Sequence, residues 1–159
     1  MAEPEAPRGL ALAETSRDKT DARVPVCIYQ NITARDVDVT VRFRPVGGSM
    51  DQAGGIAVRL SDARNYYLVR ANALENNVRL YLVADGVRRQ FAGRDVKVAS
   101  GEWHTLRLRA EGEAFRVFFD NQALFEARDG RMTGAGRVAL WSKADSVTHF
   151  AELSVEVLP

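Results

Sequence analysis

The segment 103–128 constrains the fold of this chain more than any other. It contains three runs in which apolar and polar residues alternate, WHTLRLRA, AFRVFFD and ALFEAR, separated by the short turn sequences EGE and NQ. A period of two places the apolar side chains on one face of an extended strand. Short turns between such runs join antiparallel neighbours. The segment therefore predicts two consecutive hairpins and an antiparallel β architecture.

The same alternation continues along the rest of the chain, and no helix of any length is indicated. Asp85-Gly86 is the strongest short hairpin signal, because a type I′ turn needs positive φ at both central residues. Strands spaced by about 8–12 residues are typical of a sandwich or a closed barrel. Uneven loops favour an all-β jelly-roll sandwich of two curved antiparallel sheets, with a barrel as the alternative. The remaining predicted strands cover residues 24–32, 38–43, 55–60, 65–72, 77–84, 87–92, 94–99, 136–142 and 148–158.

The length of 159 residues fits one domain. Residues 1–23 are polar, contain Pro4 and Pro7 and show no period, so we expect an extended, poorly ordered arm. Residues 24–159 are expected to form a single β-sandwich domain. The lone Cys27 excludes an intramolecular disulfide, and its apolar neighbours predict a small core residue.

Charge and hydropathy argue against two classes of partner. Lys and Arg total 22 and Asp and Glu total 21, a net charge of +1, whereas a nucleic-acid-binding protein normally has a basic excess. No apolar stretch approaches the length of a membrane span. We therefore expect no nucleic acid and no membrane span.

Three segments resemble one known superfamily: GGIAVRLSDARNYYLVRAN, WHTLRLRAEGEAFRVFFDNQALFEARD and GAGRVALWSKADSVTHFAELSV. From about Val37 to the C-terminus the chain resembles the concanavalin A-like lectin/glucanase superfamily. Within it, the chain is similar to bacterial domains grouped with laminin-G-like modules and with the 3-keto-disaccharide hydrolase group. The resemblance implies a jelly roll whose concave sheet binds a polysaccharide or glycoconjugate. It often implies secretion, and the opening MAEPEAP is typical of a Met placed before a processed mature end. A secreted or periplasmic location is therefore expected, with a signal peptide already removed.

The glucanase version of this fold carries its catalytic carboxylates on one strand, in the order Glu-x-Asp-x-(x)-Glu. The nearest approaches here are Asp36 with Asp38, and Glu126 with Asp129, and neither reproduces that order. No Gly-x-Ser-x-Gly elbow is present, and His104 and His149 are the only histidines. The sequence therefore leans against an enzyme.

Metal binding is restricted by the same composition. Histidine and cysteine are too few for a site built on them. A structural calcium ion held by oxygen ligands is left open, although turn formation explains each of the loop aspartates without a metal. No other cofactor is expected. The aspartates concerned are Asp51, Asp62, Asp129 and Asp145.

If apolar strand positions face inward, the opposite positions of three successive strands predict a polar and aromatic face. Sugars bind through hydrogen bonds to their hydroxyls and through aromatic rings against their apolar faces, and Arg and Asn supply planar donors. Such residues are also common on the wet side of any sheet, which remains the alternative interpretation. The candidate set is Arg59, Tyr66, Arg70, Asn72, Arg79 and Tyr81, completed by Trp141 and Lys143.

The sequence thus favours a non-catalytic carbohydrate-binding sandwich with a carbohydrate ligand as its partner. Two alternatives stay open. One is a glycoside-active hydrolase of the keto-disaccharide type, and the other is a structural or protein-interaction module.

Overall fold

The computed structural model describes residues 12–20 and 23–159, and these form strands, turns and loops. No helix in this part of the chain is long and apolar enough to cross a membrane. The strands in the described residues are β1 (Leu12–Glu14), β2 (Val26–Ala34), β3 (Val37–Gly47), β4 (Ala53–Asp62), β5 (Asn65–Asn72), β6 (Asn77–Ala84), β7 (Val87–Asp95), β8 (His104–Glu111), β9 (Ala114–Phe119), β10 (Gln122–Arg128), β11 (Gly136–Trp141) and β12 (Val147–Val157).

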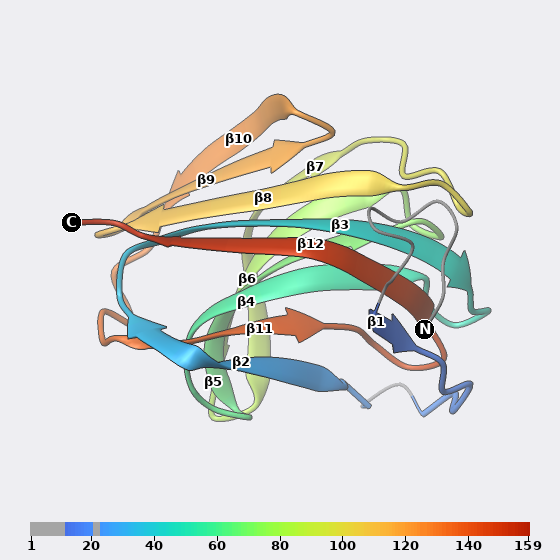
Figure 1. Ribbon diagram of the computed structural model, residues 1–159, viewed down its shortest axis with the longest axis horizontal. Coiled ribbons are helices and arrows are strands. Elements are labelled where there is room, and N and C mark those ends of the chain that lie inside the picture. The colour runs from blue at the N-terminus through green and yellow to red at the C-terminus, as the bar shows by residue number, and fades with distance from the viewer. Residues whose placement is uncertain (1–11, 21–22) are drawn as a thin grey trace.

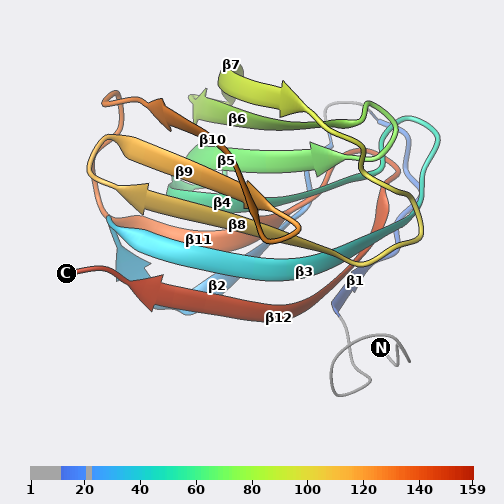
Figure 2. The same cartoon turned by 90° about the horizontal axis from the view of Figure 1, so that it is seen from above.

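The strands form two antiparallel six-stranded sheets that pack face to face (Figure 1). The first sheet has the order β1-β12-β3-β8-β9-β10, and the second has the order β2-β11-β4-β5-β6-β7. Figure 2 shows the first sheet from above, running from β12, which has the short β1 beside it, through β3 and β8 to the hairpin β9–β10 at the other edge. The predicted jelly-roll sandwich is confirmed.

The two consecutive hairpins predicted for residues 103–128 are present. β8, β9 and β10 pair in succession, with Arg109 opposite Arg116 and Phe119 opposite Gln122. The predicted type I′ turn is confirmed by φ values of 51° at Asp85 and 78° at Gly86. Residues that alternate inward from both sheets build one core, which includes Val39, Phe43, Ile56, Tyr67, Val69, Leu80, Leu106, Leu108, Phe115, Val117 and Val138.

Two expectations about the rest of the chain were wrong. The segment 94–99 is not a strand of its own, because Arg94 and Asp95 end β7 and the following loop is held by a hydrogen bond from the Val98 N–H to Asn76 Oδ1 (3.0 Å). Cys27 is exposed, because β2 is an edge strand at the open side of the sandwich. Leu12–Glu14 pairs with β12 and so belongs to the first sheet. The rest of the expected arm before Leu12 lies outside the described residues.

Arg59 closes one end of the sandwich. A bulge in β4 gives Arg59 a φ of 52°, and the side chain turns into the core with no exposed surface. Its guanidinium lies 5.8 Å from the Tyr67 ring centroid and 5.3 Å from that of Phe115. Burial lowers the pKa of Arg59, and the carboxylate of Asp36 opposes that effect.

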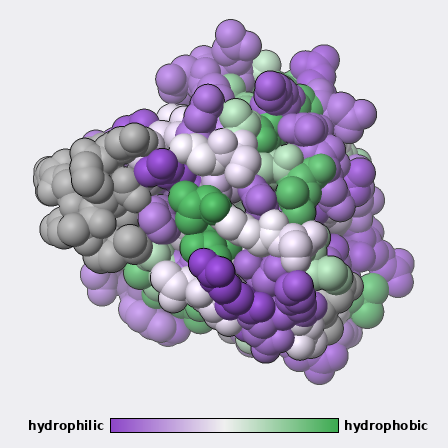
Figure 3. Space-filling model, turned by 90° about the vertical axis from the view of Figure 1, so that its right-hand side faces the viewer, coloured by the Kyte–Doolittle hydropathy of each residue, from purple (hydrophilic) through white to green (hydrophobic). Residues whose placement is uncertain are grey.

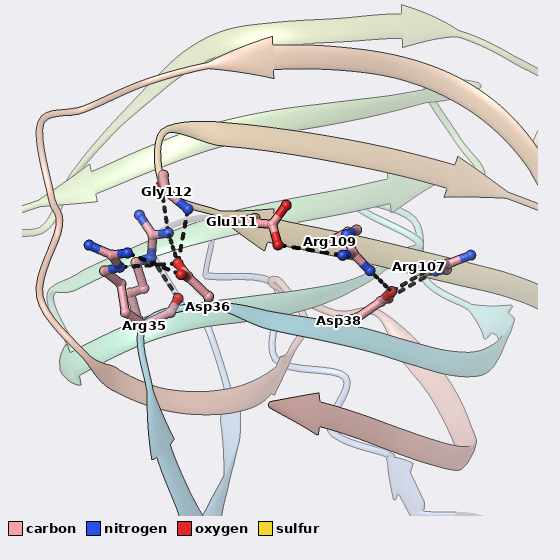
Figure 4. A network of polar contacts seen from close by, with 8 residues as sticks. Arg35, Asp36, Asp38, Arg107, Arg109, Glu111 and Gly112 are labelled. Carbon is pink, nitrogen blue, oxygen red and sulfur yellow. Dashed lines mark hydrogen bonds and ion pairs between the residues drawn. The ribbon is translucent and has the colours of Figure 1, made fainter. Parts of the chain in front are cut away.

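The Arg59 guanidinium joins three connections that are far apart in the sequence. It donates to the backbone oxygens of Arg35 (2.9 Å), Met132 (3.2 Å) and Gly112 (2.7 Å), and to Asp36 Oδ1 (3.3 Å). Asp36 in turn accepts from the Arg35 side chain and the Gly112 N–H (Figure 4). The β2–β3, β8–β9 and β10–β11 connections are therefore held by one buried cation.

Asp145 organises the opposite end, whose surface is mostly hydrophilic with small separate hydrophobic patches (Figure 3). Its carboxylate accepts hydrogen bonds from the backbone N–H groups of Ser49 (2.7 Å), Met50 (2.9 Å) and Asp51 (3.2 Å), and from the Ser49 hydroxyl (3.0 Å). Burial alone would raise the pKa of Asp145, but these hydrogen bonds lower it to about 2. The carboxylate thereby fixes the glycine-rich loop between β3 and β4.

We predict that Arg59→Met lowers the free energy of unfolding by roughly 3–5 kcal/mol, because three buried carbonyls and Asp36 lose their donor. Urea denaturation measures this. The matched control is Arg35→Met, which removes the half-exposed partner of the same carboxylate and should cost less than about 1 kcal/mol. Equal losses in the two variants would refute the role given to Arg59.

A second prediction concerns pH. Because the folded-state pKa of Asp145 is about 2 and its ordinary value is 3.8, the stabilisation is complete above pH 4. It is lost as the pH falls from about 4 towards 2. We expect Asp145→Asn to be less stable than the parent at pH 6, with the difference shrinking below pH 4. Urea midpoints at several pH values measure it, and a difference that does not change with pH would contradict this account.

Candidate functional site

The outer side of the second sheet, called here the outer face, carries a second hydrophobic cluster. These residues alternate with the core residues of the same strands, so they point away from the first sheet. Most of them are nearly inaccessible to solvent, which makes the outer face a packed surface. The cluster comprises Ala53, Ala57, Leu60, Tyr66, Leu68, Tyr81, Val83, Ala139 and Trp141.

Aromatic rings and guanidinium groups are stacked on this cluster. Trp141 Nε1 donates a hydrogen bond to the Tyr66 hydroxyl (3.2 Å). The Arg88 guanidinium lies 4.8 Å from the Tyr81 ring centroid and 5.9 Å from that of Trp141. The Arg70 guanidinium approaches Tyr81 as well, at 5.6 Å. Cation–π contacts of this kind fix the direction of each guanidinium.

Arg70 is the most deeply placed cation of the outer face, with 2% of its surface exposed. Its Nη2 donates to Glu75 Oε2 (2.9 Å) and to Asn77 Oδ1 (2.5 Å). Its Nε is buried and has no hydrogen-bond partner. Arg79 stands directly opposite Arg70 on β6. Two guanidinium-bearing residues therefore occupy neighbouring positions of this face.

Asn72 and Lys143 lie at one end of the outer face and interact with the protein itself. The Asn72 amide donates to Asp51 Oδ1 (2.9 Å), and its oxygen accepts from the backbone N–H groups of Leu74 and Glu75. Lys143 Nζ is 3.7 Å from Asp51 Oδ2. These contacts hold the β5–β6 turn and the loop before β4. Asn72 and Lys143 therefore fix one end of the outer face.

Arg59 does not belong to the outer face, and the expectation that it points outward was wrong. Regular alternation from Ile56 would have placed it there, but the bulge inserts one residue and reverses the alternation, so Leu60 faces outward instead. The other candidate strand residues share the outer face, as the alternation along their strands predicted. They are Tyr66, Arg70, Asn72, Arg79, Tyr81 and Trp141.

Sequence reasoning missed Arg88 and Gln90 of β7. They stand opposite Val83 and Tyr81 and are exposed. The run RRQ at 88–90 places polar residues on both sides of the strand, so alternation alone gives no orientation for it. The Asp85-Gly86 turn was the usable signal, because a two-residue hairpin pairs 84 with 87 and so places 88 opposite 83.

The carboxylates weighed for catalysis do not meet on this face. Asp38 lies on the outer side of the first sheet, bound by Arg107 (2.7 Å) and Arg109 (3.2 Å), as Figure 4 shows. The hydrogen bond from Arg107 is the largest cause of the lowered pKa of Asp38. Glu126 pairs with Arg116, which leaves it in a surface ion pair (3.2 Å). Neither Asp38 nor Glu126 therefore lies at the outer face.

His104, the other catalytic candidate weighed, is a packed core residue. Its ring nitrogens lie 2.9 Å from Asp120 Oδ2 and 2.8 Å from the Ala99 oxygen. Its ring stacks on Phe119 with a centroid distance of 5.1 Å. These contacts fix the ring, and β8 belongs to the first sheet, away from the outer face.

The four loop aspartates already interact with other groups of the protein, and Asp51 does so with the Asn72 amide and with Lys143. Backbone N–H donors surround Asp145, Asp62 accepts from Arg64 and Asn65, and Asp129 accepts from Tyr67 and Arg131. N–H donors occupy oxygen lone pairs that a calcium ion would need. Among the residues that the structure describes, no three His, Cys, Asp or Glu side chains gather in a group that could hold a metal.

The fold is that of the concanavalin A-like jelly-roll sandwiches. No family model and no curated protein sequence matches the chain. A carbohydrate-binding module, CBM66 from Bacillus subtilis, has 20% identity over 84% of this chain and 81% of its own, with a TM-score of 0.76. The galectin LEC-6 of Caenorhabditis elegans has 14% identity over 82% and 89%, with a TM-score of 0.59. A β-glucanase of Bacillus licheniformis has 12% identity over 81% and 69%, with a TM-score of 0.60.

Proposed function

We propose that this protein binds carbohydrate without catalysis, through the outer face of the second sheet. The observation that carries the proposal is a set of polar donors fixed above a packed aromatic surface. Arg88 is held by stacking on Tyr81 and Trp141, and Gln90 stands directly opposite Tyr81. Pre-oriented planar donors lose little conformational entropy when they bind hydroxyl groups.

The division of roles within the face follows from burial. Tyr66, Tyr81 and Trp141 are exposed by only 2%, 5% and 1%, so they act mainly as the support. The groups available to a ligand are the exposed Arg88 and Gln90 and the partly exposed Arg79. A sugar on this face would therefore be bound chiefly by hydrogen bonds from β6 and β7.

The similarity of the fold to that of a carbohydrate-binding module and of galectins supports the proposal. A hydrolase is less well supported, because Glu75, a carboxylate beside Arg70, is held in an ion pair with that arginine. Retaining and inverting hydrolysis both need two suitably placed carboxyl groups. The secreted or periplasmic location expected from the sequence stays a prediction.

The test is a glycan array probed with the purified protein and with two variants. We expect binding to a subset of glycans, weakened about tenfold or more by Arg88→Ala, as for loss of an oriented charged donor. The matched control is Arg89→Ala, because Arg89 follows on the same strand but stands opposite the inward-facing Leu82. It should leave binding unchanged.

Two outcomes would overturn the proposal. Absence of binding to any glycan would favour a structural or protein-interaction module. Release of reducing ends from a bound glycan would show catalysis, and the hydrolase alternative would replace the non-catalytic one.

A further inference from the structure

We infer that the outer face takes an anionic carbohydrate, one whose sugars carry carboxylate or sulfate groups. The inference rests on the proposed function and narrows its ligand class. It begins with the pairing of Arg70 and Arg79, which are directly opposite each other on β5 and β6. Like charges in directly opposite positions destabilise a sheet.

The positive charge of this cluster is only partly compensated. Within the described part of the chain, Arg70 pairs with Glu75, whereas Arg79 and Arg88 make no ion pair. Burial raises the pKa of Glu75, but attraction to Arg70 and, more weakly, to Arg79 lowers it overall, so one carboxylate interacts with both cations. A bound oxyanion would supply the missing negative charge.

Arg70 also keeps a donor free. Its Nε is buried without a partner, while Nη2 is engaged by Glu75 and Asn77. A buried N–H group without an acceptor costs about 1–3 kcal/mol. Guanidinium groups bind carboxylate and sulfate oxygens through two parallel N–H donors. The exposed Arg88 and the partly exposed Arg79 are the guanidinium groups that an oxyanion can reach, and Arg70 lies opposite Arg79 with its Nε–H unsatisfied.

Gly93 makes room for the cluster on β7. A Cβ atom at this position would lie 3.1 Å from Arg79 Cγ and 3.1 Å from Gln90 Nε2. Because Gly93 is the register partner of Arg79, its missing side chain lets the arginine stem lie across the strand beside Gln90. The sheet is thus shaped to bring Arg79 and Gln90 together.

Arginines on the opposite side of the molecule are arranged differently. There Arg107 and Arg109 share the carboxylate of Asp38, and Arg109 also lies 3.5 Å from Glu111 (Figure 4). Arg116 pairs with Glu126. Each of these three arginines thus has a carboxylate partner, whereas Arg79 and Arg88 have no ion pair among the described residues. With a net charge of only +1, this local excess fits a small charged ligand better than a nucleic acid.

The experiment compares oligosaccharides that differ only in charge, by calorimetry at low and high salt. One pair is oligogalacturonide and its carboxyl-reduced form, and the other is a sulfated oligosaccharide and its desulfated form. We expect the charged member of at least one pair to bind about tenfold more tightly, and the advantage to fall with salt. Which pair shows it identifies the anion.

The variants are Arg79→Gln and Arg88→Gln, with Arg89→Gln as the matched control. The first two should lose about tenfold in affinity for the charged sugar and little for its neutral form, and the control should lose nothing. If neutral and charged sugars bind equally, the anion inference fails while the proposed function stands. If no sugar binds, both fail. Binding of every polyanion alike, unaffected by Arg88→Gln, would also overturn the inference.

Discussion

The buried guanidinium of Arg59 is the interaction on which the arrangement of the sandwich most depends. A charge in a protein interior is tolerated only when its donors are matched by acceptors, and here three backbone carbonyls and Asp36 supply them. Those acceptors come from three separate connections at one end of the molecule. Asp145 does the same at the other end with the opposite charge, collecting backbone N–H groups. One ion at each end thus closes a core that two curved sheets would otherwise leave open.

The same residue links the core to the outer face. The left-handed conformation at Arg59 turns its side chain inward and sends Leu60 outward, where Leu60 joins Tyr66 and Trp141. The bulge also brings the β4 backbone against Gly136, where a Cβ atom would lie 2.3 Å from the Arg59 carbonyl carbon. A single irregularity in β4 therefore shapes both sides of the second sheet.

The alternation of apolar and polar residues was sufficient to predict most of the fold, because the face on which a strand residue lies depends on the local period and on the turn residues. It placed the hairpins from β8 to β10, the Asp85-Gly86 turn and the outward direction of Tyr66, Arg70 and Trp141. It failed where the backbone leaves the regular period. Positive φ at a non-glycine residue such as Arg59 has no signature in composition, because its cause is the set of distant acceptors around the side chain.

Exposure was harder to predict than direction. Cys27 lies in an apolar run and is exposed, because its strand lies at the edge of a sheet, and Tyr66 faces outward and is buried, because Trp141 packs on it. Arg88 and Gln90 were missed because a strand that is polar on both sides carries no period. Residues that contact a ligand often lie on such strands, because a strand that is exposed to solvent does not need an apolar face.

The features of the outer face that would favour ligand binding also lower the stability of the free protein. Arg70 opposite Arg79, with one carboxylate between them and one N–H unpaired, is a costly arrangement for the free protein. The packed surface of Leu68, Tyr81 and Trp141 beneath it offsets that cost and keeps the guanidinium groups in place. Donors that are fixed and not yet satisfied before a ligand arrives need little reorganisation to bind it. The hydrophobic cluster on what would otherwise be a solvated sheet face is therefore best understood as the support that lets a cationic site persist.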